Sequence, residues 1–189
     1  MSLSVLERLR EATRPAHERL EERLDMLSKL GSVEQRRTLA AAFHRLHAGM
    51  ERELAPWLAD LDGLDFDDRR RSLVLDADLA ALGATAPAPT AAPRPAGRAE
   101  ALGLMYVLEG SSLGGKVIRK HAERAGLDMS GLGFLDPYGE RTGQAWRSFL
   151  AVLERECPAQ DEALGQAAAR GGVMGFAHAE QVLLDGSGS

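Results

Sequence analysis

The stretch EALGLMYVLEGSSLGGKVIRKH, residues 100–121, decides the fold of this chain. Its apolar residues recur at helical spacing on both sides of a glycine-rich centre, residues 110–115. A glycine inside a helix costs about 0.5–1 kcal/mol relative to alanine, and sequences keep that cost mainly where a helix bends or where another group touches its backbone. The pattern therefore predicts a kinked helix that carries a flat ligand on its glycines.

Two alternative roles for these glycines stay open. Gly110 and Gly114 are spaced as in a small-residue contact, in which two helices approach each other closely. The pattern Gly110-x4-Gly115-Lys116 also matches the first part of a phosphate-binding loop, but Val117 stands where that loop needs a hydroxyl for magnesium. We therefore disfavour a nucleotide site and keep the helix contact as the main alternative. Charged residues within 100–121 exclude a membrane span.

Composition predicts a single globular domain that covers residues 1–189. The chain is 44% hydrophobic and 27% charged, and its net charge of −5 argues against a general nucleic-acid surface. Its single cysteine, Cys157, allows no internal disulfide, and we expect it to be a half-buried helix residue. Charges near the N-terminus do not fit a signal peptide. We therefore expect a cytoplasmic protein with neither nucleic acid nor membrane as a partner.

Capping patterns and prolines predict the helix boundaries. Ser4 with Glu7 and Ser32 with Gln35 form capping boxes, which begin helices. Pro15 is expected to divide the first helical region into residues 5–13 and a second helix from residue 15. Further helices are expected over 32–56, 73–82, 139–156 and 160–184, and the prolines of 83–97 make that segment an extended surface connection within the domain. No segment alternates with period two, so we predict an all-α fold, a compact bundle of six to eight helices.

Most of the histidines fit ordinary structural roles. His44, His47 and Glu51 share a helical face, but the second Glu-x-x-His motif of a di-iron bundle is missing, so a metal site there is disfavoured. His121 suits the C-terminal dipole of its helix, and His178 has no recognisable partner. The acidic residues of 60–71 do not fit the positions of an EF-hand calcium loop.

His17 differs because of its neighbours. It lies on the apolar stripe of its predicted helix, so we expect it to point into the core, and Arg14 and Arg10 precede it by one and two turns. A histidine with nearby arginines suits an apolar, anionic ligand such as heme. A core histidine whose hydrogen bonds are satisfied is the alternative that stays open.

Two segments resemble the heme oxygenases. REATRPAH, residues 10–17, resembles their proximal-histidine segment, and YVLEGSSLGG, residues 106–115, resembles their distal helix in its bacterial form. The two segments stand in the family's order, and WRSFL, residues 146–150, is similar to a late helix that carries a propionate-binding arginine. The resemblance thus extends over most of the chain and implies a heme-oxygenase-like bundle with a kinked, glycine-rich distal helix.

The resemblance also implies an activity and a site. Such an enzyme cleaves heme to biliverdin with release of carbon monoxide and ferrous iron, so heme is both cofactor and substrate, and dioxygen is consumed. Electrons are expected from a separate reductase or ferredoxin, because the sequence carries no flavin or nicotinamide fingerprint. An acceptor of biliverdin, such as a bacterial phytochrome, is a further implied partner. The implied catalytic residues are His17, as axial iron ligand, Gly110, Ser111, Ser112 and Gly114, and the implied heme-binding residues are Arg10, Tyr106, Gly115, Arg147 and Phe176.

One position departs from the animal enzymes of the family. Ser111 stands where those enzymes carry a distal aspartate, and a hydroxyl organises water less strongly than a carboxylate does. We therefore expect ordered water on the glycine segment to deliver protons, with Ser111 and Ser112 assisting. Two other functions stay open: a non-catalytic heme or tetrapyrrole binder on the same fold, and an unrelated helical nucleotide binder.

Overall fold

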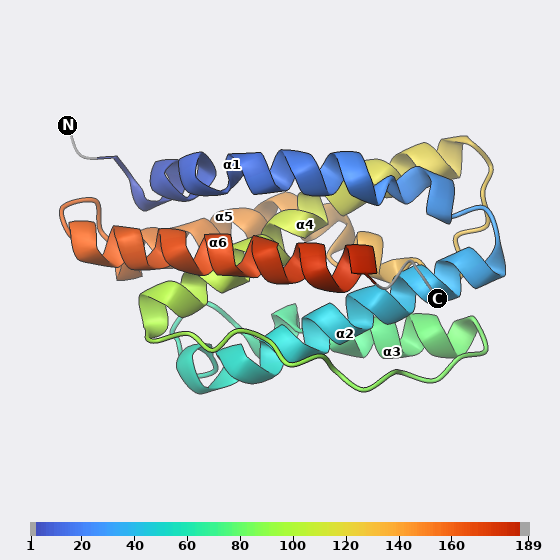
Figure 1. Ribbon diagram of the computed structural model, residues 1–189, viewed down its shortest axis with the longest axis horizontal. Helices are drawn as coiled ribbons and strands as arrows, with labels where there is room; N and C mark the ends of the chain where they lie inside the picture. Colours follow the sequence, from blue (N-terminus) through green and yellow to red (C-terminus); the bar gives the residue numbers. More distant parts are fainter. Residues whose placement is uncertain (1–2, 186–189) are drawn as a thin grey trace.

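The computed structural model describes residues 3–185, and the side chain of the last of these is not considered. Within that range it is built from helices alone, without a β-strand, which confirms the predicted all-α fold (Figure 1). The six α-helices are α1 Val5–Leu24, α2 Val33–Leu58, α3 Ser72–Ala81, α4 Arg98–Arg124, α5 Thr142–Glu156 and α6 Glu162–Asp185, and short 3-10 turns occur in the segments between them. Within the described residues, no helix combines the length and apolar character needed to cross a membrane.

Helix α1 is one continuous helix, so the predicted break at Pro15 is wrong. Its start is as predicted, because Ser4 and Glu7 form a complete capping box. Pro15 lies inside the helix and is exposed, so its ring meets solvent, not another element. The packing of α1 along α6 holds the helix together across the proline, although one backbone hydrogen bond is lost there.

Helices α2 and α3 form the other side of the molecule, with residues 84–95 running along them without helix or strand (Figure 1). The Ser32–Gln35 capping box that begins α2 is complete, as the sequence predicts. Thr90 fixes the extended segment to α2, because its hydroxyl donates to the carbonyl oxygen of Arg45 at 3.1 Å. A Cβ on Gly49 would stand 2.3 Å from the carbonyl oxygen of Thr90, so this glycine allows the close approach.

Helices α1 and α4 each pack along α6, whereas they make few contacts with each other. A Cβ on Gly103 of α4 would lie 1.9 Å from the carbonyl oxygen of Ala168 in α6. Gly172, one turn after Ala168 on α6, also faces α1, because a Cβ on it would lie 2.7 Å from Leu9 and 2.9 Å from Thr13. A small-residue helix contact therefore exists, but it lies at Gly103, two turns before the glycines that the sequence pattern singled out.

Helix α4 is uninterrupted from residue 98 to residue 124. Its glycines at 110–115 therefore lie within the helix and form no loop, which excludes a phosphate-binding loop at that place. The ammonium group of Lys116 instead contacts the backbone carbonyl of Gly139 and the hydroxyl of Thr142. The kink at the glycines stays a prediction.

Candidate functional site

The predicted site residues are placed by the parallel course of α1, α4 and α6. Leu9 and Thr13 of α1 and Gly103 of α4 all approach Gly172 of α6, so the three helices share one level there. About one turn further along, His17 of α1 lies against Phe176 of α6, with ring centroids 5.6 Å apart and an edge-on arrangement. Val107 of α4 approaches Gly175 of α6 at about the same level as Phe176. Gly110 follows Val107 by about one turn of α4.

His17 lies on the surface, and the expectation that it points into the core is wrong. Its side chain is 54% exposed, and Nδ1 stands 3.5 Å from the Glu21 carboxylate, one turn further along α1. The apolar stripe of α1 instead buries Leu9, Thr13 and Leu24. An exposed imidazole whose Nδ1 faces a carboxylate presents Nε2 to a ligand, and carboxylates orient metal-binding histidines in this way.

Gly110 and Gly114 border open space. Apart from the neighbouring residues and the nearby backbone of α4 itself, a Cβ built on either glycine would meet no atom within 4 Å. Leu113 and Val117 lie close to the same face of α4, and the side chains of both are exposed, Val117 by 69%. This part of α4 therefore presents bare backbone next to apolar side chains, which suits a flat apolar ligand.

We call the surface formed by Gly110, Leu113, Gly114 and Val117 the open face of α4. Tyr106 lies one turn before Gly110 and connects this face to α1. Burial raises the pKa of its phenol, and the charge of Arg10 with hydrogen bonding to Thr13 and Arg10 offsets this only in part. On its other side the Tyr106 ring lies 5.7 Å from Trp146 of α5. Two of the residues predicted to bind propionates, Arg10 and Tyr106, thus come together, and the third, Arg147, is exposed on α5 next to Trp146.

Ser112 and Gly115 lie on the other side of α4. Ser112 is buried, and its hydroxyl donates to the carbonyl oxygen of Glu109 within the same helix at 2.6 Å. A Cβ on Gly115 would stand 2.2 Å from the carbonyl oxygen of Leu135. Gly115 therefore allows close packing of the 133–135 turn, and this geometry does not support the direct ligand contacts that the sequence suggested for these two residues.

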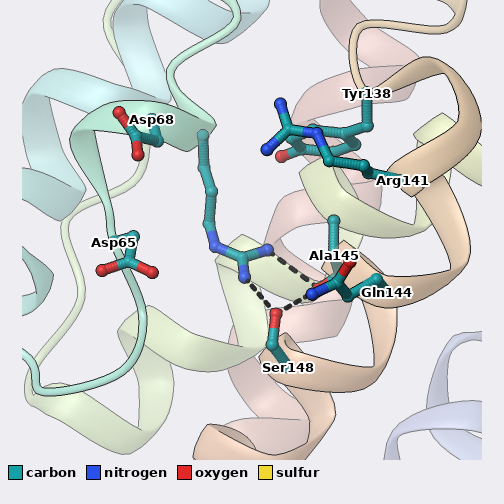
Figure 2. Close-up of a pocket in the computed structure, with 8 residues that line it drawn as sticks. Asp65, Asp68, Tyr138, Arg141, Gln144, Ala145 and Ser148 are labelled. Atoms are coloured by element: carbon teal, nitrogen blue, oxygen red, sulfur yellow. Dashed lines mark hydrogen bonds between the residues drawn. The ribbon is translucent and has the colours of Figure 1, made fainter.

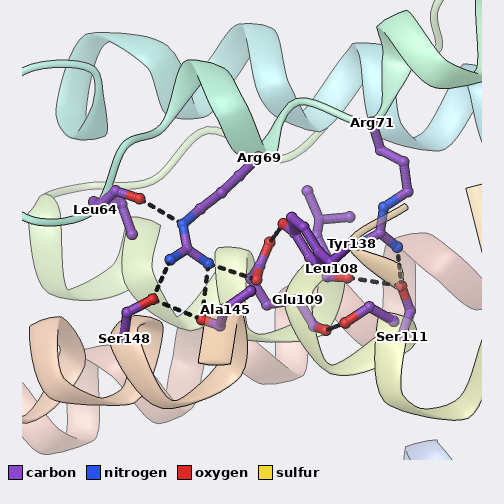
Figure 3. A network of polar contacts seen from close by, with 10 residues as sticks. Leu64, Arg69, Arg71, Leu108, Glu109, Ser111, Tyr138, Ala145 and Ser148 are labelled. Atoms are coloured by element: carbon purple, nitrogen blue, oxygen red, sulfur yellow. Dashed lines mark hydrogen bonds and ion pairs between the residues drawn. The ribbon is translucent and has the colours of Figure 1, made fainter. Parts of the chain in front are cut away.

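A buried polar network lies behind the open face (Figure 3). Nη1 of Arg69 lies 2.7 Å from the carboxylate of Glu109, which also accepts a hydrogen bond of 2.7 Å from the Tyr138 hydroxyl. Nη1 of Arg71 donates to Oγ of Ser111 at 2.9 Å, and its guanidinium lies 6.0 Å from the Tyr138 ring centroid. Burial, together with the Glu109 charge, raises the pKa of the Tyr138 phenol, so Tyr138 stays protonated and acts as the donor.

The network continues into α2 through Glu51. Its carboxylate accepts hydrogen bonds from the backbone amides of Arg71, at 2.7 Å, and Ser72, at 3.1 Å. Burial acts to raise the pKa of the Glu51 carboxyl, but the hydrogen bonds from His47, Ser72 and Arg71 outweigh it and lower that pKa. Burial lowers the pKa of the His47 imidazole, so this side chain is neutral and donates from Nδ1 towards Glu51, 3.5 Å away.

The histidines of α2 form no metal centre. His44 pairs with Asp76 at 3.0 Å, and His47 pairs with Glu51, so the two rings face different carboxylates. The described residues contain no group of three or more histidine, cysteine or acidic side chains that is placed to hold a metal ion. Cys157 is buried just after α5, where burial and nearby acidic groups raise the pKa of its thiol to about 11.

A polar cavity of about 350 Å³ opens next to this network (Figure 2). Asp65 and Asp68 line one side of it, and Tyr138 and Arg141 line another. The guanidinium of Arg69 reaches between them and donates to the hydroxyl of Ser148 at 2.8 Å. Arg69 and Tyr138 line the cavity and also contact Glu109, so these two side chains connect the cavity to the buried network.

Sequence reasoning missed this network. Arg69, Arg70 and Arg71 follow several aspartates, a composition that is typical of a solvated loop, yet Arg69 and Arg71 are buried. Their partners Glu109 and Ser111 are 40 residues away along the chain. The one local signal was Glu109 itself, a carboxylate inside an otherwise apolar helical stretch, which needs a partner when buried.

Known proteins resemble the chain over nearly its whole length. A family model described as heme oxygenase matches residues 3–183. A curated protein named heme oxygenase, from Xanthomonas campestris pv. campestris (strain 8004), is 39% identical over 139 residues, which cover 71% of this chain and 80% of that protein. The NO- and CO-bound heme oxygenase from Neisseria meningitidis superimposes with a TM-score of 0.81 over 99% of this chain and 94% of that one, and at 22% identity this likeness shows a shared fold. From the family match and the 39% identical relative, the chain belongs to the heme oxygenase family.

Proposed function

We propose that this protein cleaves heme to biliverdin and releases carbon monoxide and ferrous iron. One observation carries the proposal: an exposed imidazole, His17, stands at nearly the same level of α6 as a bare stretch of α4 backbone, at Gly110 and Gly114. A planar macrocycle with a central iron needs a nitrogen ligand on one side and free space on the other. Family membership makes heme the ligand that fits both requirements.

The surroundings suit the rest of the heme molecule. Leu113 and Val117 offer exposed apolar surface beside the glycines, as an apolar macrocycle requires. Arg10 lies beside Tyr106 at one end of this face and can pair with a propionate. Arg147 is assigned the same role, which rests on the resemblance and on its place next to Trp146.

His17 is assigned the role of axial ligand. The Nδ1 atom of His17 lies 3.5 Å from the Glu21 carboxylate, which can hold the N–H group on that nitrogen. The lone pair of Nε2 is then available to iron. When bound, heme supplies both the iron that activates dioxygen and the carbon skeleton that is cleaved.

Ser111 is assigned an assisting role in proton delivery. Its hydroxyl donates to the Leu108 carbonyl oxygen at 2.7 Å and accepts from Arg71 at 2.9 Å. The single proton of the hydroxyl is therefore already used, while its remaining lone pair can hold a water molecule. Protons then come from ordered water on the open face of α4, with Arg71 fixing the position of Ser111.

The partners follow from the same assignment. A separate reductase or ferredoxin supplies electrons, since the sequence offers no site for a flavin or a nicotinamide. A biliverdin acceptor such as a bacterial phytochrome, and a cytoplasmic location, are expectations that rest on the resemblance and on the sequence. A non-catalytic heme binder on this fold remains the competing function, and a single-turnover experiment separates the two.

In this experiment the protein is titrated with hemin under anaerobic conditions and is then exposed to air with ascorbate as reductant. We expect a Soret band at one heme per chain that decays while the biliverdin spectrum rises. A Soret band that persists under air and reductant would instead identify a heme-binding protein without this activity, and no band at all would contradict both.

A further inference from the structure

A second and larger cavity lies on the side of α6 that faces away from His17. It has a volume of about 870 Å³, and α2, α3, α6 and residues 84–91 line it. His178 lines this cavity, whereas Phe176, two residues earlier, lies against His17. Residues two apart on a helix point to roughly opposite sides, so the cavity is separate from the proposed heme site. Its volume is within the range of about 300–1,000 Å³ that is typical of small-molecule sites.

The charged groups of this cavity are all cationic. Arg37 and Arg45 line it, and no carboxylate does, although the chain as a whole carries a net charge of −5. Nε of Arg37 donates to the carbonyl oxygen of Leu82, which fixes that guanidinium in place. The structure gives the half-buried Arg45 guanidinium no hydrogen bond or ion pair among the described residues. An unpaired guanidinium in a cavity without acids suits an anionic ligand.

His178 adds a neutral polar group. The residue is 7% exposed, and its Nε2 is buried without a hydrogen-bond partner in the part of the chain that the structure describes. Burial lowers the pKa of this imidazole, so it is uncharged near neutral pH and offers one N–H and one lone pair. A buried polar atom without a partner costs free energy, and a ligand oxygen would satisfy it.

The remaining walls combine apolar residues with uncharged polar ones, Thr38, Thr85, Thr90 and Gln181. Leu79 of α3 and Val182 of α6 line the cavity, together with the alanines and a proline of the extended segment. The hydrogen bond from Thr90 to the Arg45 carbonyl and the close approach to Gly49 hold that segment against α2. The cavity is therefore formed without rearrangement and combines apolar surface with two cationic side chains.

We propose that this cavity binds an organic anion with an apolar body, of the class of the medium-chain carboxylates. The carboxylate pairs with Arg45, the side chain of His178 lies beside it, and the hydrocarbon chain lies along Leu79 and Val182. This site is independent of the proposed heme chemistry.

The test uses the heme-loaded protein, so that the heme site is already filled, and decanoate as the probe. Isothermal titration calorimetry should show saturable binding of one decanoate per chain. Arg45→Gln should weaken it by about tenfold or more, because a charge-assisted hydrogen bond is lost. Arg52→Gln is the matched control on the same helix, since Arg52 is exposed and contacts only the neighbouring Glu53 among the described residues, and it should leave the affinity unchanged.

A second variant keeps the test independent of folding. Thr85 is exposed and lines the cavity, so Thr85→Glu adds a carboxylate without disturbing the core and should weaken decanoate about as strongly. The uncharged 1-decanol should bind more weakly than decanoate. The proposal is overturned if decanoate does not saturate below about 1 mM, if both cavity variants bind it like the parent, or if Arg52→Gln weakens it equally.

Discussion

Helix α4 uses glycine for opposite purposes at Gly103 and at Gly110 and Gly114. In the first half, Gly103 removes a side chain so that α4 can touch the backbone of α6. In the second half, Gly110 and Gly114 remove side chains and no described part of the protein fills the space. Residue type is the same in both places, so the neighbours alone distinguish a packing glycine from a site glycine.

This difference separates stability from function along one helix. A Cβ added in the first half must displace backbone, which a close-packed interior resists. A Cβ added at Gly110 or Gly114 meets no described atom within 4 Å outside the adjoining part of α4, and it replaces a poor helix former with a better one. Substitutions at Gly103 should therefore affect folding, and those at Gly110 and Gly114 should affect the ligand.

The largest effect is expected from Gly103→Ala. The new Cβ would lie 1.9 Å from the Ala168 carbonyl oxygen, so α4 and α6 must separate, at a cost of about 3 kcal/mol or more. Urea unfolding followed by circular dichroism measures this loss. Gly110→Ala is the matched control and should be stabilised by about 0.5–1 kcal/mol. Equal stabilities of the two variants would remove the distinction between the halves.

The next largest effect is the loss of turnover in His17→Ala, with the fold retained. The exposed imidazole contributes little to packing, so the unfolding free energy should change by less than about 0.5 kcal/mol. The ferric heme spectrum should change, and no biliverdin should form in the single-turnover experiment. A parent-like spectrum together with a normal biliverdin yield would refute the assignment of His17 as the iron ligand.

Gly114→Leu should lower the affinity for hemin by about 100-fold or more without a loss of stability. The leucine side chain would occupy the open space beside α4 and block a macrocycle there. Spectroscopic titration with hemin, and then with carbon monoxide, measures the effect. If this variant binds both ligands like the parent, heme does not lie on this face of α4.

The smallest effect is expected from Ser111→Ala. Because the hydroxyl proton is already donated to Leu108, its removal should slow single-turnover heme loss by no more than about tenfold. A side-chain general acid is typically worth about 10²–10⁴-fold, so a loss of that size would make Ser111 the essential donor. Ser112→Ala, whose hydroxyl is buried on the other side of α4, is the control for a general effect on the helix.

Local signals predicted most of the fold. Both capping boxes begin helices where the sequence places them, and the ends of α2, α3, α5 and α6 agree within a few residues. Pro15 was misleading because its effect depends on tertiary packing, and α1 is held along α6 on both sides of it. The exposure of His17 was missed for a related reason. Periodicity identifies the residues that share one face of a helix, but it does not show how far along that face other helices pack.

The site was less accessible to sequence reasoning. Arg69 and Arg71 lie in a charge-rich segment that is typical of solvent-exposed loops, and only the fold brings them to Glu109 and Ser111. The sequence left a helix contact at Gly110 and Gly114 open as an alternative, but the glycines of α6, at 171, 172 and 175, meet α4 in the region of Gly103 instead. Spacing alone cannot choose between two sets of glycines on one helix.

The joint packing of α1 and α4 on α6 has a mechanical consequence. Since α1 and α4 hardly touch each other, the separation between them can increase without giving up the buried surface that either shares with α6. Pro15 deprives α1 of one backbone hydrogen bond just before His17, but beyond it His17 lies against Phe176 and Arg19 pairs with Glu180, both on α6. The part of α1 that carries His17 therefore stays with α6, and a widening of the site for a rigid planar molecule has to move α1 as a whole relative to α4.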